Sequence, residues 1–484
     1  MEAYGVAQFV DSTVSGLVAD VAIVGSGAGA AAVGGELARA GLDVLLVEAG
    51  GPLNSGRPGS HIRNAFPAES QLETRYGPQV WGDLVPFAYG ADRFAAMRGA
   101  LSIHSVGGML SYWSHACPVP DLETEGEPAV PSAEMQALWQ RALGLLWADT
   151  SIEAPGVRQR RVLAAVRAGF PDLPAGREVQ PLRVAMRRIA DGRLEFAGAD
   201  ALLAPGSSGS AVRILAGHPV RSVMMQGSRA VGLIAGREGS DVTINAGAVV
   251  VAAGAIGTPQ LLHASEVRPE ALGRYLVDHT QLVSRVKLRD DLLSDVPEND
   301  VTFSVWIPAS SARDIHTQIS RGWITSSPIL AGIDSRLTAD IGQFTGVDPQ
   351  PDNRVIFSDD AIDRFGLPVV DIRFELSRAD RDRAARMFSD HYRVAETIAD
   401  FGYALEASFM PPGTSLHLMG THRMGAVDDG TSVTDSYGRV WGTEGLFLAG
   451  NGLISTGNAG NPTVNNVALA LRVAEGVLAS ASTG

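Results

Sequence analysis

The chain has 484 residues, of which 45% are hydrophobic and 19% charged, and its formal net charge is −14. This length predicts more than one domain, and the acidic balance disfavours a nucleic-acid partner or an anionic membrane surface. Cys117 is the only cysteine, so we expect neither an internal disulfide nor a cysteine-based metal cluster, and we predict no metal site.

The first twenty residues contain no basic residue and no apolar stretch of the signal-peptide type. No apolar run elsewhere reaches the 18 residues that a membrane-spanning helix needs. These two observations favour a cytoplasmic protein that has no membrane partner.

Residues 20–50 read DVAIVGSGAGAAAVGGELARAGLDVLLVEAG. The apolar run Val21–Val24 predicts a buried strand that ends in a glycine-rich turn. A helix is predicted at Ala31–Ala40, and a second strand at Val44–Val47 leads into Glu48. An acid about 20 residues after the glycines is typical of a dinucleotide-binding unit.

Each small or acidic residue of this unit has an expected role. Gly25 permits the tight turn, and Gly27 lets the backbone approach a pyrophosphate, which the positive end of the helix dipole attracts. Ala30 is the third small residue, where the helix packs against the strand. Glu48 can accept hydrogen bonds from a ribose and would repel the extra phosphate of NADP. FAD and NAD both remain open.

Three further segments narrow the choice of cofactor. They are RGALSIHSVGGMLSYWSHACP (Arg98–Pro118), VTINAGAVVVAAGAIGTPQLLHAS (Val242–Ser265), and a tail that contains GTSLHLMGTHRMG and GNAGNPT. Together with residues 20–50 they resemble the glucose–methanol–choline (GMC) family of FAD-dependent oxidoreductases, and ALGRYLVDH (Ala271–His279) also looks like that family. VGGMLSYWSHACP and GNAGNPT look most like pyranose oxidases and their bacterial glycoside-oxidising relatives.

The resemblance implies an α/β fold, α+β overall. In this fold a Rossmann-like FAD-binding domain is interleaved with a substrate domain built on an antiparallel sheet. The expected FAD-binding domain takes residues 1–60, 96–130, 200–268 and 410–484, and the substrate-binding domain takes 61–95, 131–199 and 269–409. Alternation at Val301–Ile307 and Val369–Phe374 agrees with strands of that sheet. The tail predicts a strand at Leu446–Ala449 and a helix from Thr463 toward Leu478.

Carried over position by position, the resemblance implies a set of FAD-binding residues. These are Gly25, Gly27, Ala30, Glu48, Gly107, Gly108, Met109, Ser111, Val220, Ala253, Gly450, Asn451, Pro462 and Thr463. Fungal pyranose oxidases attach FAD through the histidine of G-G-M-x-x-H-W, but Tyr112 occupies that place here and His115 comes three residues later. We therefore expect non-covalent FAD, with Tyr112 beside the flavin or substrate, or else as an ordinary core aromatic.

Alcohol oxidation by a flavin needs a base for the hydroxyl proton, and a neutral imidazole can serve near pH 7. In family terms the base opens the motif H-x-x-G-T, which matches His417. The family's second position, histidine or asparagine, falls on Asn461, whose amide can position a substrate oxygen but cannot take a proton. His422 is the alternative base; otherwise it orients the loop or helps to line the flavin pocket.

The resemblance thus implies FAD-dependent oxidation of a secondary hydroxyl of a pyranose sugar or glycoside. Position 3 of glucosides, including C-glycosides, is the leading expectation, with oxygen or another electron acceptor. Position-2 oxidation of free glucose is the alternative. In another class, the same fold hosts non-redox hydroxynitrile lyases. A protein that only binds a ligand is disfavoured, because both His417 and Asn461 are present.

Overall fold

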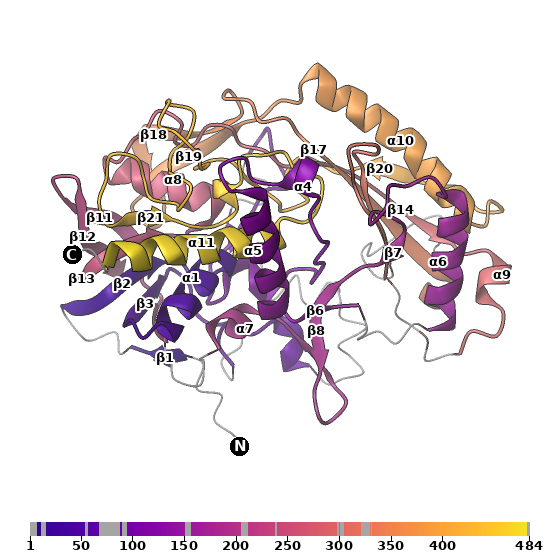
Figure 1. Ribbon diagram of the computed structural model, residues 1–484, viewed down its shortest axis with the longest axis horizontal. Helices are drawn as coiled ribbons and strands as arrows, with labels where there is room; N and C mark the ends of the chain where they lie inside the picture. Colours follow the sequence, from indigo (N-terminus) through magenta and orange to yellow (C-terminus); the bar gives the residue numbers. More distant parts are fainter. Residues whose placement is uncertain are drawn as a thin grey trace.

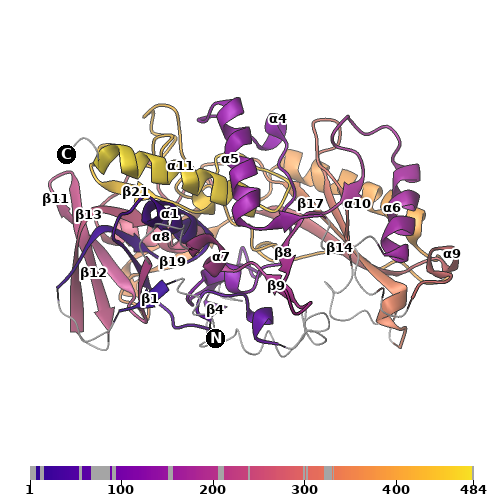
Figure 2. The same ribbon diagram turned by 60° about the horizontal axis from the view of Figure 1, so that its bottom comes forward.

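The structure is a computed structural model, and it describes residues 7–10, 16–53, 57–66, 88–89, 94–150, 156–204, 212–237, 240–297, 300, 304–320, 330 and 332–481. Figures 1 and 2 show one large sheet toward one end of the long axis and a second sheet toward the other end. Among the described residues, no helix combines the length and apolarity that crossing a membrane requires.

The larger sheet has eight strands in the order β1-β10-β3-β2-β13-β12-β11, with β21 paired to β13. The strand bounds are β1 Ala7–Phe9, β2 Leu17–Val24, β3 Val44–Glu48, β10 Val212–Ala216, β11 Val220–Gln226, β12 Arg229–Arg237, β13 Ser240–Val251 and β21 Leu446–Leu448. Pairing is parallel from β1 through β13 and to β21, whereas β11 and β12 are antiparallel. Every residue of β3 is buried, as a strand covered on both faces requires.

Helices rich in small residues cover this sheet. Helix α1 (Ala28–Arg39) connects β2 to β3 and packs against α11 (Thr463–Ala481), which in turn contacts α5 (Ser132–Leu145) (Figure 1). A Cβ atom on Gly29 of α1 would lie 3.1 Å from Oδ1 of Asn466 in α11 and 2.7 Å from the backbone N of Gly450, which precedes η7 (Asn451–Leu453), so helix and loop approach α1 closely. Helix α7 (Ala199–Leu203) also contacts α1, and α8 (Gly254–Ala264) packs on β11.

The second sheet has six antiparallel strands in the order β20-β14-β17-β16-β15-β7. Their bounds are β7 Gln180–Pro181, β14 His279–Lys287, β15 Ser304–Ile307, β16 His316–Ser320, β17 Thr338–Gly346 and β20 Ala407–Phe409. Helices α6 (Val157–Gly169) and α10 (Arg378–Ile398) lie together on this sheet and share its apolar core (Figure 1). The predicted combination of a Rossmann-like domain and an interleaved domain on an antiparallel sheet is confirmed.

Short elements complete the described chain. Small sheets form from β4 (Ala88–Tyr89) with β5 (Ser102–Ile103), from β6 (Ala148–Asp149), β8 (Val184–Arg188) and β9 (Leu194–Phe196), and from β18 (Arg354–Ile362) with β19 (Pro368–Arg373). The short helices are α4 (Leu122–Glu125) and α9 (Asp290–Leu293). The 3-10 turns are η1 (Ile62–Ala65), η4 (Gly108–Ser111), η6 (Ser335–Leu337) and η7 (Asn451–Leu453).

The structure bears on three expectations about the substrate domain. The strand expected at Val301–Ile307 is described from Ser304 onward, and residues 301–303 lie outside the described residues. The strand expected at Val369–Phe374 is β19, but it pairs with β18 and this ribbon packs on α8 instead of joining the six-stranded sheet. Helix α5, expected in the substrate domain, shares the core of the large sheet. Alternation predicts that a strand forms but does not name its partner. We propose that α5 and the β18–β19 ribbon belong with the cofactor domain.

Candidate active site

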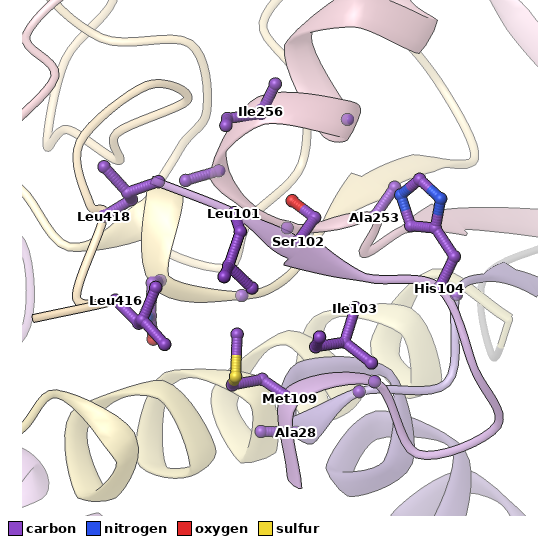
Figure 3. Close-up of a pocket in the computed structure, with 18 of the residues that line it drawn as sticks. Ala28, Leu101, Ser102, Ile103, His104, Met109, Ala253, Ile256, Leu416 and Leu418 are labelled. Carbon is purple, nitrogen blue, oxygen red and sulfur yellow. The ribbon is translucent and has the colours of Figure 1, made fainter. Parts of the chain in front are cut away.

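A cavity of about 800 Å³ lies where the large sheet, α8 and the C-terminal loops meet the edge of the second sheet. Figure 3 shows the segment Leu101–His104 crossing it, with Ala28 and Met109 on one side and Ala253 and Ile256 of the α8 region on the other. The predicted site residues that line it are Gly25, Gly27, Glu48, Gly108, Met109, Tyr112, Val220, Ala253, His417, Gly450, Asn451, Asn461, Pro462 and Thr463. Ala30, Gly107, Ser111 and His422 are absent from the lining.

The glycine-rich turn opens the N-terminus of α1 onto the cavity. Gly27 is the N-cap of α1, no side chain caps that end, and a Cβ atom on Gly27 would meet nothing within 4 Å. Gly25 has φ +94°, and a Cβ atom there would lie 2.6 Å from the carbonyl oxygen of Ala252. The free N–H groups and the positive dipole end of α1 are therefore accessible to an anion.

Glu48 ends β3 at the cavity and is held by two hydrogen bonds. Its Oε2 accepts from Ser26 Oγ at 2.6 Å, and its Oε1 accepts from the backbone N of Gly50 at 2.9 Å. Burial raises the pKa of Glu48 to about 7. Ser26, which sequence analysis did not select, also accepts from the backbone N of Gly107 at 2.9 Å. Its position inside the glycine turn was the signal that could have found it.

The three cofactor-set residues that do not line the cavity support its wall from behind. Gly107 has φ +98° and begins the turn η4. Ser111 donates its hydroxyl to the carbonyl of Val106 at 3.1 Å. Ala30 is fully buried inside α1. Gly107 and Ser111 shape the turn that carries Gly108, and Ala30 packs in the first turns of α1; their contact with the cofactor stays a prediction.

His417 and Asn461 come together although they lie 44 residues apart. His417 Nε2 lies 3.1 Å from Asn461 Nδ2, and both residues line the cavity. Gln318 of β16 donates its Nε2 to Asn461 Oδ1, so the second sheet contacts this pair directly. The Asn461 loop is held by Glu125, whose Oε1 accepts from the backbone N of Ala459 and Gly460 at 2.9 and 2.7 Å.

Electrostatics keep His417 neutral. Burial lowers the pKa of His417 well below its ordinary value, and the nearby imidazoles of His279 and His316 lower it further. Its Nδ1 lies 2.9 Å from Nδ1 of His279. A neutral imidazole on a cavity wall has a ring nitrogen that can accept a proton.

His422 is not among the residues that line the cavity. It is fully buried, its backbone N donates to the carbonyl of Gly452 at 3.1 Å, and a Cβ atom on Gly452 would collide with its ring. Burial lowers the pKa of His422 to about 3. These contacts favour the expected role of His422 in orienting the loop, and its alternative role as base stays a prediction.

Tyr112 lies at the cavity, whereas His115 lies in the protein interior. Tyr112 ends η4 and lines the cavity. His115 has φ +64°, is fully buried, and packs against the rings of His61, Trp113 and Phe196. His115 does not reach the cavity lining.

The second sheet supplies side chains that sequence analysis did not select. Gln281 and Val283 of β14 and Phe344 of β17 line the cavity. Alternation along β14 places His279, Gln281 and Val283 on one face. That alternation was the available signal, but it could not show which face meets the cofactor domain.

The cavity lining offers hydrogen-bond acceptors and helix N-termini that suit the ribose hydroxyls and phosphates of a dinucleotide. Oδ1 of Asn451 and Oδ1 of Asn466 are buried without a hydrogen-bond partner among the described residues, and both residues line the cavity. Helices α1, α8 and α11 all begin at its wall. Buried unpaired oxygens and uncapped helix N-termini are groups that a ligand satisfies.

We expect Gly27→Val to fold but to purify without FAD, because its side chain would point into the space next to the N-terminus of α1. Gly29→Val should instead lower the unfolding temperature, since its Cβ would meet the backbone of Gly450. Gly144→Val, on the exposed side of α5, is the matched control and should retain FAD. Absorbance at the flavin band and thermal unfolding measure both effects; full FAD content in Gly27→Val would contradict the assignment.

Two models of the GMC oxidoreductase family match the chain, over residues 125–281 and 349–470. The chain is 34% identical to a C-glycoside 3-oxidase of Microbacterium trichothecenolyticum, over 94% of this chain and 95% of that protein. It is 28% identical to a pyranose 2-oxidase of Tricholoma matsutake, over 82% of this chain and 77% of that protein. Formate oxidase of Aspergillus oryzae RIB40 shares the fold, with a TM-score of 0.71, 14% identity, and coverage of 97% of this chain and 100% of that one. The chain therefore belongs to the GMC oxidoreductases, as its motifs predicted, and is a FAD-binding oxidoreductase.

Proposed function

We propose that this enzyme oxidises a secondary hydroxyl of a pyranose sugar or glycoside to the keto-sugar, at position 3 of glucosides including C-glycosides. The observation that carries the proposal is the contact of 3.1 Å between His417 Nε2 and Asn461 Nδ2 on the wall of the cavity. This arrangement supplies a proton acceptor and a hydrogen-bond donor at one point. The similarity to a C-glycoside 3-oxidase over nearly the whole chain supports the substrate class.

In the proposed reaction the substrate hydroxyl takes the place of the Asn461 amide at His417 Nε2, which accepts the hydroxyl proton, and the amide hydrogen-bonds the substrate oxygen instead. Bound FAD would supply the acceptor for the hydride of the carbon that bears the hydroxyl, and oxygen or another acceptor would take up the electrons. Glu48 and the N-terminus of α1 would hold the dinucleotide part of the cofactor. Gln281 and Phe344 would contact the sugar from the second sheet, because they line the same cavity.

Oxidation of free glucose at position 2 is the second candidate, and the similarity to a pyranose 2-oxidase favours it. The two candidates share the base and the cofactor. They differ in which carbon of the sugar ring would face the flavin when residues of the second sheet hold the sugar. The His417–Asn461 pair is compatible with both.

An anaerobic screen tests the substrate class. Glucose, an O-glucoside and a C-glucoside would each be mixed with the oxidised enzyme, bleaching of the flavin would be followed, and NMR would place the carbonyl of the product. We expect both glucosides to bleach the flavin and to carry the carbonyl at position 3. A carbonyl at position 2 of glucose would establish the alternative. No bleaching by any sugar would favour a redox-silent protein of the hydroxynitrile lyase class.

We propose that FAD is held non-covalently, because Tyr112 and not a histidine lines the cavity after Met109, while His115 is packed elsewhere. Acid precipitation should then release all of the yellow colour into the supernatant. Colour that stays in a washed pellet would show a covalent link.

The base assignment predicts a pH profile. His417 must be neutral to accept a proton, and its pKa lies below the ordinary 6.5, so flavin reduction should be flat near neutral pH and slow only in more acidic solution. His417→Ala should slow reduction by roughly 100- to 10,000-fold while FAD stays bound. Asn461→Ala should slow it less and leave the acid limb in place, because an amide does not titrate. Stopped-flow reduction measures each variant, and an unchanged rate in His417→Ala would refute the assignment.

A further inference from the structure

Two consecutive residues at the start of β14, Asp278 and His279, both contact the loop that carries His417. The carboxylate of Asp278 is buried and accepts hydrogen bonds from the backbone N of Gly413, at 2.8 Å, and from Ser415 Oγ. Ser415 Oγ in turn accepts from the backbone N of His417 at 3.2 Å. Asp278 therefore fixes the backbone of the loop and leaves the contact with the catalytic side chain to His279.

His279 meets His417 ring to ring. The two Nδ1 atoms are 2.9 Å apart, and the rings meet edge-on with centroids 4.8 Å apart. His279 is only 5% exposed, so water does not replace this contact. Two ring nitrogens can share a hydrogen bond only if one carries the hydrogen and the other a lone pair.

The far side of His417 shows where its hydrogen lies. Asn461 Oδ1 already accepts from Gln318, so the amide group that faces His417 Nε2 is the Nδ2 donor. A donor opposite Nε2 requires a lone pair on Nε2. A neutral His417 then carries its hydrogen on Nδ1 and donates it toward His279.

The far side of His279 faces Asn458. His279 Nε2 and Asn458 Oδ1 are both buried without a hydrogen-bond partner among the described residues, and the neighbouring Asn458 oxygens favour a ring N–H on that side of His279. Since Nδ1 of His279 already faces His417, that N–H belongs on Nε2. A neutral His279 therefore has its lone pair on Nδ1, where the hydrogen of His417 arrives.

We propose that His279 is the positioning residue that accepts the Nδ1 hydrogen of His417 and thereby keeps the Nε2 lone pair of His417 on the substrate cavity. The inference rests on the proposed role of His417 as the base. In the reaction the hydroxyl O–H bond breaks, a new N–H bond forms at His417 Nε2, and the ring becomes an imidazolium. Its Nδ1–H bond to His279 then becomes charge-assisted and stabilises the positive charge.

His279 must stay neutral to accept this hydrogen. Three titratable groups face it or its neighbours: the Asp278 carboxylate beside it, His417 on the opposing loop, and His316 on β16. Arg177 and Arg313 act on His316 from behind. Burial outweighs the charge of Asp278 and lowers the pKa of His279, so the ring holds its lone pair at neutral pH.

Three substitutions at His279 separate positioning from packing. His279→Asn retains an acceptor oxygen near the place of Nδ1 and should keep the anaerobic rate of flavin reduction within about 5-fold of the natural enzyme. His279→Leu removes the acceptor and should slow reduction by roughly 10- to 100-fold with little change in KM, less than the loss of His417 itself. His279→Asp places a carboxylate beside Nδ1, should raise the pKa of His417, and should move the acid limb to higher pH.

A second readout does not depend on turnover. The oxidised holoenzyme labelled with ¹⁵N-histidine would be examined by long-range ¹H–¹⁵N correlation, and the His417 signals would be identified by their loss in His417→Asn. We expect the Nδ1–H form of His417 in the natural enzyme and in His279→Asn. The Nε2–H form in the natural enzyme would overturn the proposal, and this measurement decides it even if His279→Leu fails to fold.

His263→Asn is the control, because His263 stacks on Phe357 away from the cavity lining and should leave rate and pH profile unchanged. FAD content checks that each variant is loaded.

Equal losses in His279→Asn and His279→Leu would reduce His279 to a packing role and overturn the inference. If His417→Ala reduces FAD at the natural rate, the proposed function itself fails. If His417→Ala loses flavin reduction but His279→Leu keeps the natural rate and acid limb, the proposed function stands and this inference fails.

Discussion

The contact between His417 and Asn461 is the interaction on which the site depends, because it joins loops that precede different elements and it is continued into the second sheet. Gln318 of β16 binds Asn461, and His279 of β14 binds His417. Both ring nitrogens of His417 are therefore engaged: Nδ1 meets His279, which strand pairing of β14 fixes, and Nε2 meets Asn461, which Gln318 of the paired strand β16 holds. A base held on both sides in this way loses little rotational freedom when substrate arrives.

Buried carboxylates hold the loops that carry this pair. Asp278 accepts from the backbone before His417, Glu125 from the backbone before Asn461, and Glu127 from the backbone and hydroxyl of Ser455. Asp278 and Glu127 each meet two donors and Glu125 meets three, which offsets part of the cost of burying these carboxylates. Burial raises the pKa values of Glu125 and Glu127. Loops without regular structure thus acquire the rigidity that catalysis needs.

The cavity combines apolar walls with helix N-termini. Leu101, Ile103, Ile256, Leu416 and Leu418 form much of the wall in Figure 3, while α1, α8 and α11 point their N-termini toward it. An apolar wall weakens screening, so the dipoles of these helices act more strongly on a bound anion. The same burial lowers the pKa values of the histidines around the cavity and keeps them neutral. The same apolar surroundings therefore strengthen the binding of the anionic part of the cofactor and keep the base neutral.

The sequence by itself determined the nucleotide-binding unit, the family and the two residues of the proposed catalytic pair. A glycine-rich turn and a carboxylate at the end of the next strand depend only on nearby residues, so their spacing in the sequence reveals them. Gly25, Gly27 and Glu48 all line the cavity, as that spacing predicted. Only the tertiary structure showed that β19 pairs with β18 and that His422 is not part of the cavity lining. It also showed that His279 and Gln318 contact the catalytic pair. The contacts of His279 with His417 and of Gln318 with Asn461 join residues more than 100 positions apart in the chain. A one-dimensional pattern does not encode such pairings, because they arise only when the two sheets pack against each other.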